Sequence, residues 1–127
     1  MKTEVLIAQN LFAIRVTNKK TQTWVSNQIG VTFQQVQKYE KTINSISVVR
    51  LLKFCEVFEI NIGDFLNSNA HIIIQESKLD KFTKEKCFLQ LQQIEINHKY
   101  LTERKEHDKG RSNKDMVGQS LDPRTYL

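Results

Sequence analysis

The feature that most constrains the fold of this chain is one glycine, Gly30, between two short segments that carry helix capping signals. Thr21 precedes the first segment and Thr32 precedes the second, and threonine is favoured at helix N-termini. A glutamine three residues after Thr32 completes a capping-box pattern. Gly30 stands where helices commonly end in a left-handed residue. The sequence therefore predicts a helix over residues 22–29, a tight turn, and a helix over residues 33–41.

Two short helices joined by a three- or four-residue turn with a glycine form the helix-turn-helix arrangement. Its helices cross at a steep angle, so they need apolar residues where they touch and a small residue at the closest approach. Ser26 is that small residue, and the apolar positions are Val25, Ile29, Val31, Val36 and Tyr39. The spacing of these residues around Gly30 favours this arrangement over a chance pair of helices.

Apolar periodicity predicts three more helices around this pair. Leu6, Ala8, Leu11 and Ile14 give one apolar face, which predicts a first helix over residues 4–19. Ser47 caps a fourth helix with apolar positions in the run from Val48 to Phe58, and Asn61 caps a short fifth helix that ends at Leu66. Residues 1–68 are therefore predicted to form one compact unit of five short helices.

The sequence changes character after residue 68. Residues 71–75 hold three consecutive isoleucines, which fit a short strand or a buried linker. Residues 79–107 form a long helical candidate. Its expected apolar face contains Phe82, Leu91, Ile94 and Leu101, broadened by Cys87 and Phe88. Residues 69–107 are thus predicted to be a helical extension. Residues 108–127 are polar and lack periodicity, which predicts a disordered tail.

Composition narrows the function classes. Four glycines and one proline are few for a β-sandwich or barrel, so an all-α protein is favoured. The net charge of +5 permits binding to nucleic acid without requiring it. No nucleophile–base pair and no metal-ligand spacing is visible, so we expect no catalytic site, metal or cofactor. Cys55 and Cys87 lie within apolar runs, which indicates buried free thiols and a reducing, cytoplasmic location without a membrane span.

Several motifs lie at the ends of the first three predicted helices and within the last two. They are Leu11-x-x-Ile14-Arg15, Thr21-Gln22, Tyr39-Glu40-Lys41, Leu51-Leu52-Lys53-Phe54-Cys55 and Ile60-Asn61-Ile62-Gly63-Asp64-Phe65-Leu66. In this order and without a gap over residues 4–66, they resemble the Cro/cI-type helix-turn-helix family, also called xenobiotic-response-element-like. The run from Thr32 to Lys41, followed by Asn44, Ile46, Ser47, Arg50 and Leu51, is similar to a variant common in bacterial regulators. The resemblance implies a five-helix, lambda-repressor-like domain.

This resemblance also implies sequence-specific binding to double-stranded DNA, with the helix over residues 33–41 in the major groove. The expected DNA contacts are Gln22, Thr32, Phe33, Gln34, Gln37, Lys38, Lys41 and Asn44. Glutamine can pair with adenine and lysine with guanine, while Gln22, Lys41 and Asn44 are expected at phosphates. Arg15 and Glu40 match a family pair that ties the first helix to the end of the third.

Three positions depart from the family pattern. Thr42 replaces the glycine that usually follows the recognition helix, Ser45 replaces a basic residue, and Glu59 replaces a second glycine. We therefore expect the loop after the third helix to be less tightly turned than in the family.

The extension leaves the function open between two main interpretations. In the first, the chain is a homodimeric transcriptional regulator, expected to be a repressor, that dimerises through Phe82, Leu91, Ile94 and Leu101. In the second, it is an antitoxin or other interaction module that binds a protein partner through residues 69–127. RNA or nonspecific nucleic-acid binding is a weaker third interpretation, because the aromatic platforms of common RNA modules are absent.

Overall fold

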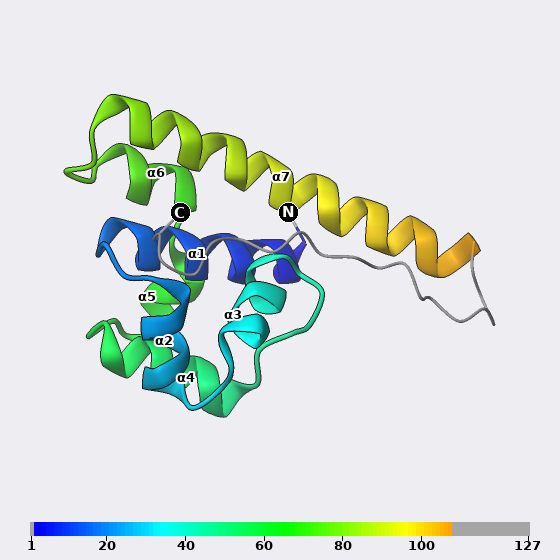
Figure 1. Ribbon diagram of the computed structural model, residues 1–127, viewed down its shortest axis with the longest axis horizontal. Coiled ribbons are helices and arrows are strands. Elements are labelled where there is room, and N and C mark those ends of the chain that lie inside the picture. Colours follow the sequence, from blue (N-terminus) through cyan, green and yellow to red (C-terminus); the bar gives the residue numbers. More distant parts are fainter. Residues whose placement is uncertain (1, 108–127) are drawn as a thin grey trace.

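The computed structural model describes residues 2–107, and within that range the chain forms seven helices and no strand (Figure 1). The helices are α1 (Thr3–Thr17), α2 (Gln22–Ile29), α3 (Phe33–Glu40), α4 (Val48–Val57), α5 (Ile62–Asn67), α6 (Ala70–Gln75) and α7 (Lys81–His107). The all-α prediction is confirmed. The expected disordered tail, residues 108–127, lies outside the described residues. None of the described helices is long and apolar enough to span a membrane.

The capping residues explain where α2, α3, α4 and α5 begin. The side-chain oxygens of Thr21, Thr32, Ser47 and Asn61 each accept a hydrogen bond from a backbone N–H of the first helical turn, at 2.7–3.2 Å. Each bond satisfies a donor that has no partner within the helix. Four starts that the sequence predicted are therefore confirmed.

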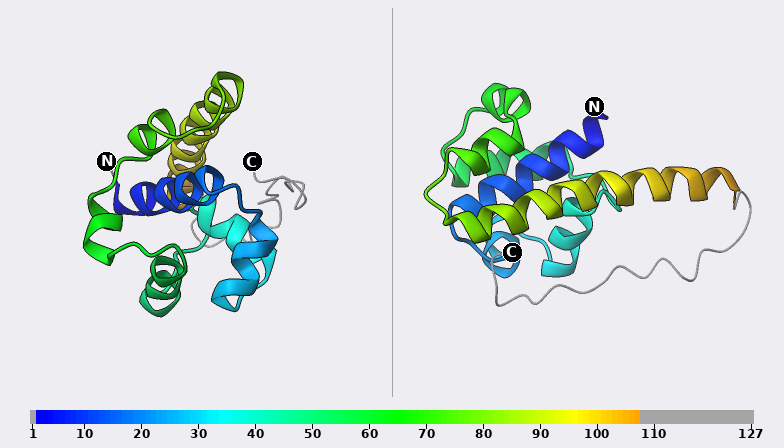
Figure 2. Two further views of the ribbon diagram at one scale, coloured as in Figure 1. Left: turned by 90° about the vertical axis from the view of Figure 1, so that its left-hand side faces the viewer. Right: turned by 90° about the horizontal axis from the view of Figure 1, so that it is seen from above.

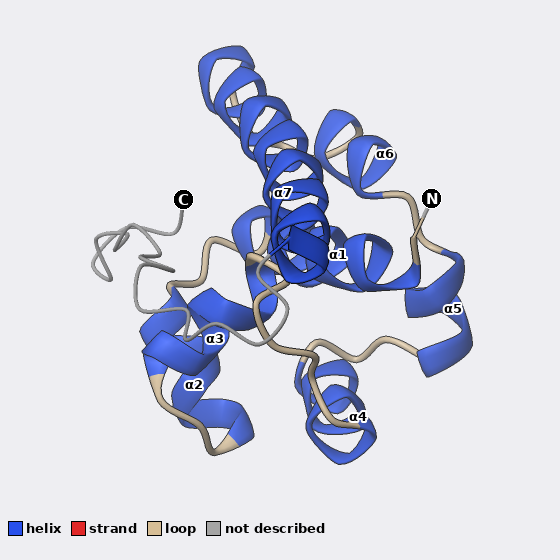
Figure 3. Ribbon diagram, turned by 90° about the vertical axis from the view of Figure 1, so that its right-hand side faces the viewer, coloured by secondary structure: helices blue, strands red, loops and turns tan. Residues whose placement is uncertain are grey.

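The first helix lies in the middle of the fold, with α6 and α7 on one side and α2–α5 on the other (Figure 3). Leu11 and Ile14 face the core shared with α2–α5. Ala8 and Phe12 face the core shared with α6 and α7. The expectation of one apolar face on the first helix was therefore wrong. A helix that is apolar on both sides is buried between two layers.

Two buried amides of α1 join these layers. Gln9 Nε2 donates to the backbone oxygen of Leu91 in α7, at 2.8 Å. Asn10 Nδ2 donates to the backbone oxygens of Phe65 and Ser68, at 3.0 and 3.2 Å. A buried amide without a partner would be destabilising, so these bonds fix the positions of α5 and α7 against α1.

Residues 71–75 are helical, so neither a strand nor a linker is correct for this segment. Asn69 caps α6 by accepting from the N–H of Ile72, at 3.2 Å. Ala70 and Ile74, four residues apart, are buried against α1, whereas Ile72 is exposed. The run of isoleucines hid this helical spacing, because apolar residues occupied both faces of the short helix.

The long helix α7 begins at Lys81, close to the predicted start, and its apolar residues divide between two faces. Cys87, Leu91 and Ile94 are buried against α1 and α6. Phe82 is exposed on another side of the helix, and Leu101 is partly buried. Leu91 and Ile94 are thus core residues, and their expected place in a dimer interface is wrong. Figure 2 shows α7 running past the end of α1.

Candidate nucleic-acid interface

The turn between α2 and α3 has the geometry that Gly30 predicts. Gly30 has φ 75° and ψ 40°, in the left-handed region. The N–H groups of Gly30 and Val31 both donate to the backbone oxygen of Ser26, at 2.9 and 3.1 Å. Val25, Ile29 and Val36 are buried between the helices, and Val31 packs against the same cluster. The helix-turn-helix arrangement is therefore present as predicted.

Arg50, in α4, stabilises this turn. This role was not predicted from the sequence. Its Nη1 donates to the backbone oxygen of Ile29, at 3.0 Å. This bond satisfies a carbonyl at the C-terminal end of α2, where a cation is also favoured by the helix dipole. A Cβ atom at Gly30 would lie 3.2 Å from the same nitrogen. The signal was present in the sequence, because Arg50 belongs to the quoted bacterial variant.

A buried ion pair holds α3 against α1. Arg15 Nε lies 2.7 Å from Glu40 Oε2, and Arg15 Nη2 donates to Glu40 Oε1 at 3.0 Å. Arg15 Nη1 donates to the backbone oxygen of Lys20 at 2.8 Å. This bidentate geometry fixes the angle of the guanidinium as well as its distance. The structure thus brings together the pair that the family resemblance implied.

Gln22 belongs to this buried cluster, and its expected role as a side-chain phosphate contact is wrong for this structure. Its Nε2 donates to Glu40 Oε1 at 3.1 Å, and its Oε1 is buried without a hydrogen-bond partner. Glu40, at the C-terminal end of α3, accepts from both Gln22 and Arg15, which draws the side chain of Gln22 inward. Gln22 therefore supports the position of α3 from the start of α2.

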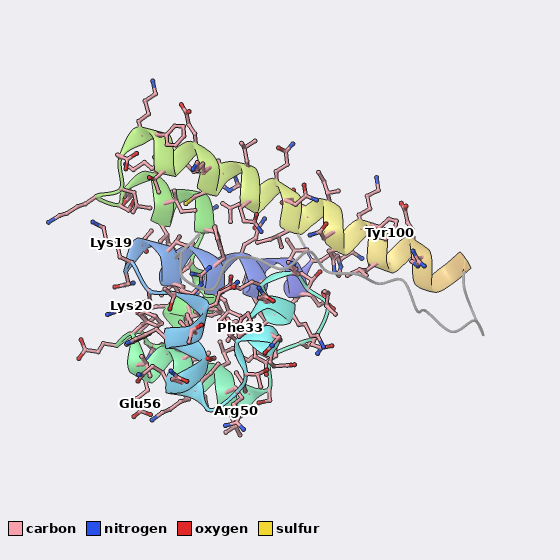
Figure 4. All side chains as sticks on the ribbon, in the orientation of Figure 1. Lys19, Lys20, Phe33, Arg50, Glu56 and Tyr100 are labelled. Carbon is pink, nitrogen blue, oxygen red and sulfur yellow. The ribbon has the colours of Figure 1, made fainter. Side chains whose placement is uncertain are left out.

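The outward side of α3 carries part of the predicted contact set. Thr32, Gln34 and Lys38 are exposed, and Phe33 is half-buried. Gln34 and Lys38 are four residues apart, so they lie on the same face of the helix. Phe33 and Arg50, labelled in Figure 4, lie in the half of the molecule that contains α2–α4. Asn44, in the loop after α3, is exposed and donates to Gln35 Oε1 at 3.4 Å.

Two other predicted contacts are buried instead. Gln37 and Lys41 are each less than a tenth exposed, so neither is presented on the outward face in this structure. Burial lowers the pKa of Lys41, because desolvation disfavours its charged form. Gln37 lies next to Val36 on the inner side of α3, which has eight residues. The sequence suggested the outward face because the side chain of Gln37 is polar.

The loop after α3 is tightly turned, contrary to the expectation from Thr42. Thr42 has φ 60°. The N–H of Ile43 donates to the oxygen of Lys38 at 2.9 Å, and that of Thr42 donates to the oxygen of Tyr39 at 3.3 Å. These two bonds define a Schellman motif, in which glycine is usual. The helix ends as in the glycine-bearing pattern, with a threonine in the left-handed conformation.

Cys55 and Cys87 are both free and buried, as the sequence predicts. Burial raises the pKa of Cys87 from 9.0 to about 11. Within the described residues, no group of three or more His, Cys, Asp or Glu side chains is placed to hold a metal ion. Among the described residues, the candidate site consists mainly of exposed polar side chains on α3, a helix held in place by the Arg15–Glu40 pair.

Comparison with known proteins assigns this region to a family. Residues 10–70 match the model of the Cro/C1-type HTH DNA-binding domain. The chain is 39% identical over 64 residues to an uncharacterized HTH-type transcriptional regulator of Rickettsia prowazekii, covering 50% of this chain and 49% of that protein. A counterpart in Rickettsia conorii is 38% identical over 64 residues, covering 50% of this chain and 51% of that protein.

A third relative, an uncharacterized HTH-type transcriptional regulator of Sinorhizobium fredii, is 32% identical over 72 residues, covering 57% of this chain and 50% of that protein. The chain thus spans about half the length of the curated relatives that it matches. No solved structure matches it significantly. The turn geometry, the braced third helix and the family match agree, and residues 10–70 of this chain belong to the Cro/C1-type helix-turn-helix DNA-binding family.

Proposed function

We propose that this chain is a sequence-specific, double-stranded DNA-binding transcriptional regulator that acts as a homodimeric repressor. One observation carries the proposal furthest: Gln34 and Lys38 stand exposed on one face of α3, while the Arg15–Glu40 pair fixes that helix from behind. Reading base edges requires side chains held in a defined register, and a helix in the major groove supplies them. The names of the three relatives support a role in transcription.

The proposed DNA contacts follow from the exposed residues. Gln34 and Lys38 have the chemistry to read adenine and guanine, and Phe33 can touch a thymine methyl group. Thr32 and Asn44 stand at the two ends of this surface, where hydroxyl and amide groups can bond phosphates. Gln22, Gln37 and Lys41 are assigned to support of the helix instead. The proposed activity is binding and not catalysis, and the cytoplasmic location stays a prediction.

Selection of bound sites from a random duplex library, with the folded full chain, tests this function. The proposal predicts an enriched motif whose two halves are related by a two-fold axis, because a homodimer presents two identical recognition helices. Placing the selected motif across a promoter should lower expression of a reporter gene. A folded protein that enriches no motif would contradict sequence-specific binding, and raised expression would contradict the repressor role.

A further inference from the structure

The outward side of α7 carries a row of large apolar side chains. They stay exposed, because no other described helix covers them. Phe82 is 66% exposed, Leu89 66%, Ile96 52% and Tyr100 55%. The core residues of the same helix, Leu91 and Ile94, are 0% exposed. Three of the four exposed residues are spaced by seven positions, which places them on one line along the helix. A long helix with two apolar lines on different faces has a second surface to bury.

The spacing along this line is that of a coiled-coil seam. Phe82, Lys86, Leu89, Gln93, Ile96 and Tyr100 follow one another at intervals of four, three, four, three and four residues. We call these six residues the α7 seam. Its alternate positions, those of Phe82, Leu89 and Ile96, are all apolar, and the positions between them include Lys86 and Gln93. Polar residues at such positions specify register and oligomer number at the expense of stability.

The length of α7 is a second observation that favours a bound helix at the seam. With 27 residues against 15 in α1, α7 extends past the N-terminal end of α1 (Figure 1). Tyr100, labelled in Figure 4, lies on this distal part of the helix. An unsupported helical segment shorter than about 12–15 residues is marginal in water. Packing against a second helix would stabilise the extended part.

The charges beside the seam select a second copy of α7 in antiparallel orientation. If Phe82 packs against Tyr100 of the second copy, Glu85 lies opposite Lys99 of that copy, and the two-fold axis repeats the pair. In a parallel arrangement, Lys86 would meet Lys86, and Lys99 would approach Arg104. Residues that flank a seam determine the orientation of the helices through such pairs. Glu85 and Lys99 are not buried in the single chain, so both are accessible to a partner.

We propose that the α7 seam is a self-association surface through which two copies of this chain pair with antiparallel α7 helices. The inference deepens the homodimer of the proposed function and replaces Leu91 and Ile94 with Leu89 and Ile96 as interface residues. Phe82 belongs to both sets. The surface is defined without reference to DNA, so the experiments below are carried out in its absence.

Sedimentation equilibrium of the full chain tests the surface. We expect dimers with a dissociation constant of about 1–100 µM. The antiparallel pair sets Leu89 against Gln93 and Ile96 against Lys86, so the interface is modest. Leu89→Glu should weaken self-association at least about a hundredfold, since it inserts two charges at the centre of the seam. Val49→Glu, at an equally exposed apolar residue of α4, is the matched control and should leave the constant unchanged. Circular dichroism should show both variants folded, because neither residue is buried.

Charge reversal tests the orientation. In the antiparallel pair, Lys99→Glu places a second carboxylate opposite Glu85 and should weaken the dimer about five- to tenfold, and adding Glu85→Lys should restore it. In a parallel pair, the single Lys99→Glu change would strengthen the dimer, because the new carboxylate would pair with Arg104. That result would overturn the antiparallel arrangement.

Two outcomes would overturn the surface itself without affecting the proposed DNA reading. One is a monomer at every concentration up to about 200 µM, which lies above the expected dissociation constant; the seam would then be left for a different protein partner. The other is a dimer that Leu89→Glu does not weaken, which would place the homodimer interface elsewhere. The affinity of the Leu89→Glu variant for a single DNA half-site is measured separately. Because one copy suffices to bind a half-site, this affinity tests the proposed role of α3 independently of the dimer.

Discussion

Arg15 Nε and Glu40 Oε2 lie 2.7 Å apart in the interior, and they join the middle helix of the fold to the C-terminal end of α3. The two residues are 25 positions apart in sequence, so this is a tertiary contact. Because the same carboxylate also accepts from Gln22, one residue determines how α1, α2 and α3 meet. The orientation of the proposed recognition helix depends on this cluster.

Removing one member of the ion pair should strongly destabilise the fold. We expect Glu40→Ala to lower the free energy of unfolding by about 3–5 kcal/mol, because it leaves a buried guanidinium without its counter-charge. Urea denaturation measures the change. The exposed pair of Lys53 and Glu56, at 3.7 Å, offers the control: Glu56→Ala should change stability by less than about 1 kcal/mol. Equal effects for the two variants would contradict a structural role for the buried pair.

Gly30→Ala should destabilise the turn between α2 and α3. A β-carbon in the left-handed region is unfavourable by about 1–2 kcal/mol, and here it would also approach Arg50 Nη1 at 3.2 Å. Gly30→Asn should lose less, because asparagine tolerates this conformation better. Thermal unfolding of the two variants compares them. A smaller loss for alanine than for asparagine would show that the backbone strain is not the cause.

Glycine should stabilise the two helix ends where this chain departs from the family pattern. Thr42 and Glu59 have φ 60° and 56°, and each ends a helix with the two bonds of a Schellman motif. We expect Thr42→Gly and Glu59→Gly each to raise the free energy of unfolding by about 0.5–1 kcal/mol. Glycine removes the strain of the left-handed conformation, and the greater entropy that glycine loses on folding offsets part of this gain. Glu56→Gly, inside α4, should instead lower it by about 1 kcal/mol. If the denaturant midpoint fell for all three variants, the claim that Thr42 and Glu59 are strained in the left-handed conformation would be contradicted.

The thiol of Cys87 should make stability depend on alkaline pH. Its pKa is raised to about 11 in the folded protein, so the folded state holds the proton more tightly than the unfolded state does. The stabilising contribution is therefore complete below the ordinary thiol pKa of 9.0 and lost as the pH rises through about 11. The difference in unfolding free energy between the wild type and Cys87→Ala, measured from about pH 8 to 11, isolates this contribution from other titrating groups. A constant difference would contradict the raised pKa.

The local chemistry of the N-terminal unit was predictable because α2–α5 each begin at a residue whose side chain caps the helix. Thr21, Gly30 and Thr32 fix the turn through bonds to neighbouring backbone groups, and such bonds depend on a few adjacent residues. The Arg15–Glu40 pair was implied only by the family resemblance, because nothing local brings positions 25 residues apart together. Residue type and spacing were sufficient for the helix-turn-helix and for its family.

The inward or outward direction of particular side chains was less predictable. Gln37 and Lys41 are polar, and polarity alone suggested that they face solvent, yet both are buried in this fold. Leu91 and Ile94 looked available for a dimer because the sequence does not show that α1 has a second apolar face for them to cover. The helical spacing of α6 was hidden for a similar reason, since its three isoleucines occupy both buried and exposed positions.

Random-library selection, carried out in parallel on the wild type, Gln34→Ala and Lys38→Ala, tests most directly whether α3 reads the DNA. Lys53→Ala and Gln75→Ala are matched controls with exposed side chains outside α3. We predict a two-fold symmetric motif for the wild type and both controls. In each α3 variant, preference should relax at specific bases by about 1–3 kcal/mol per base pair. An unchanged motif in both α3 variants would contradict the claim that this face of α3 reads the DNA.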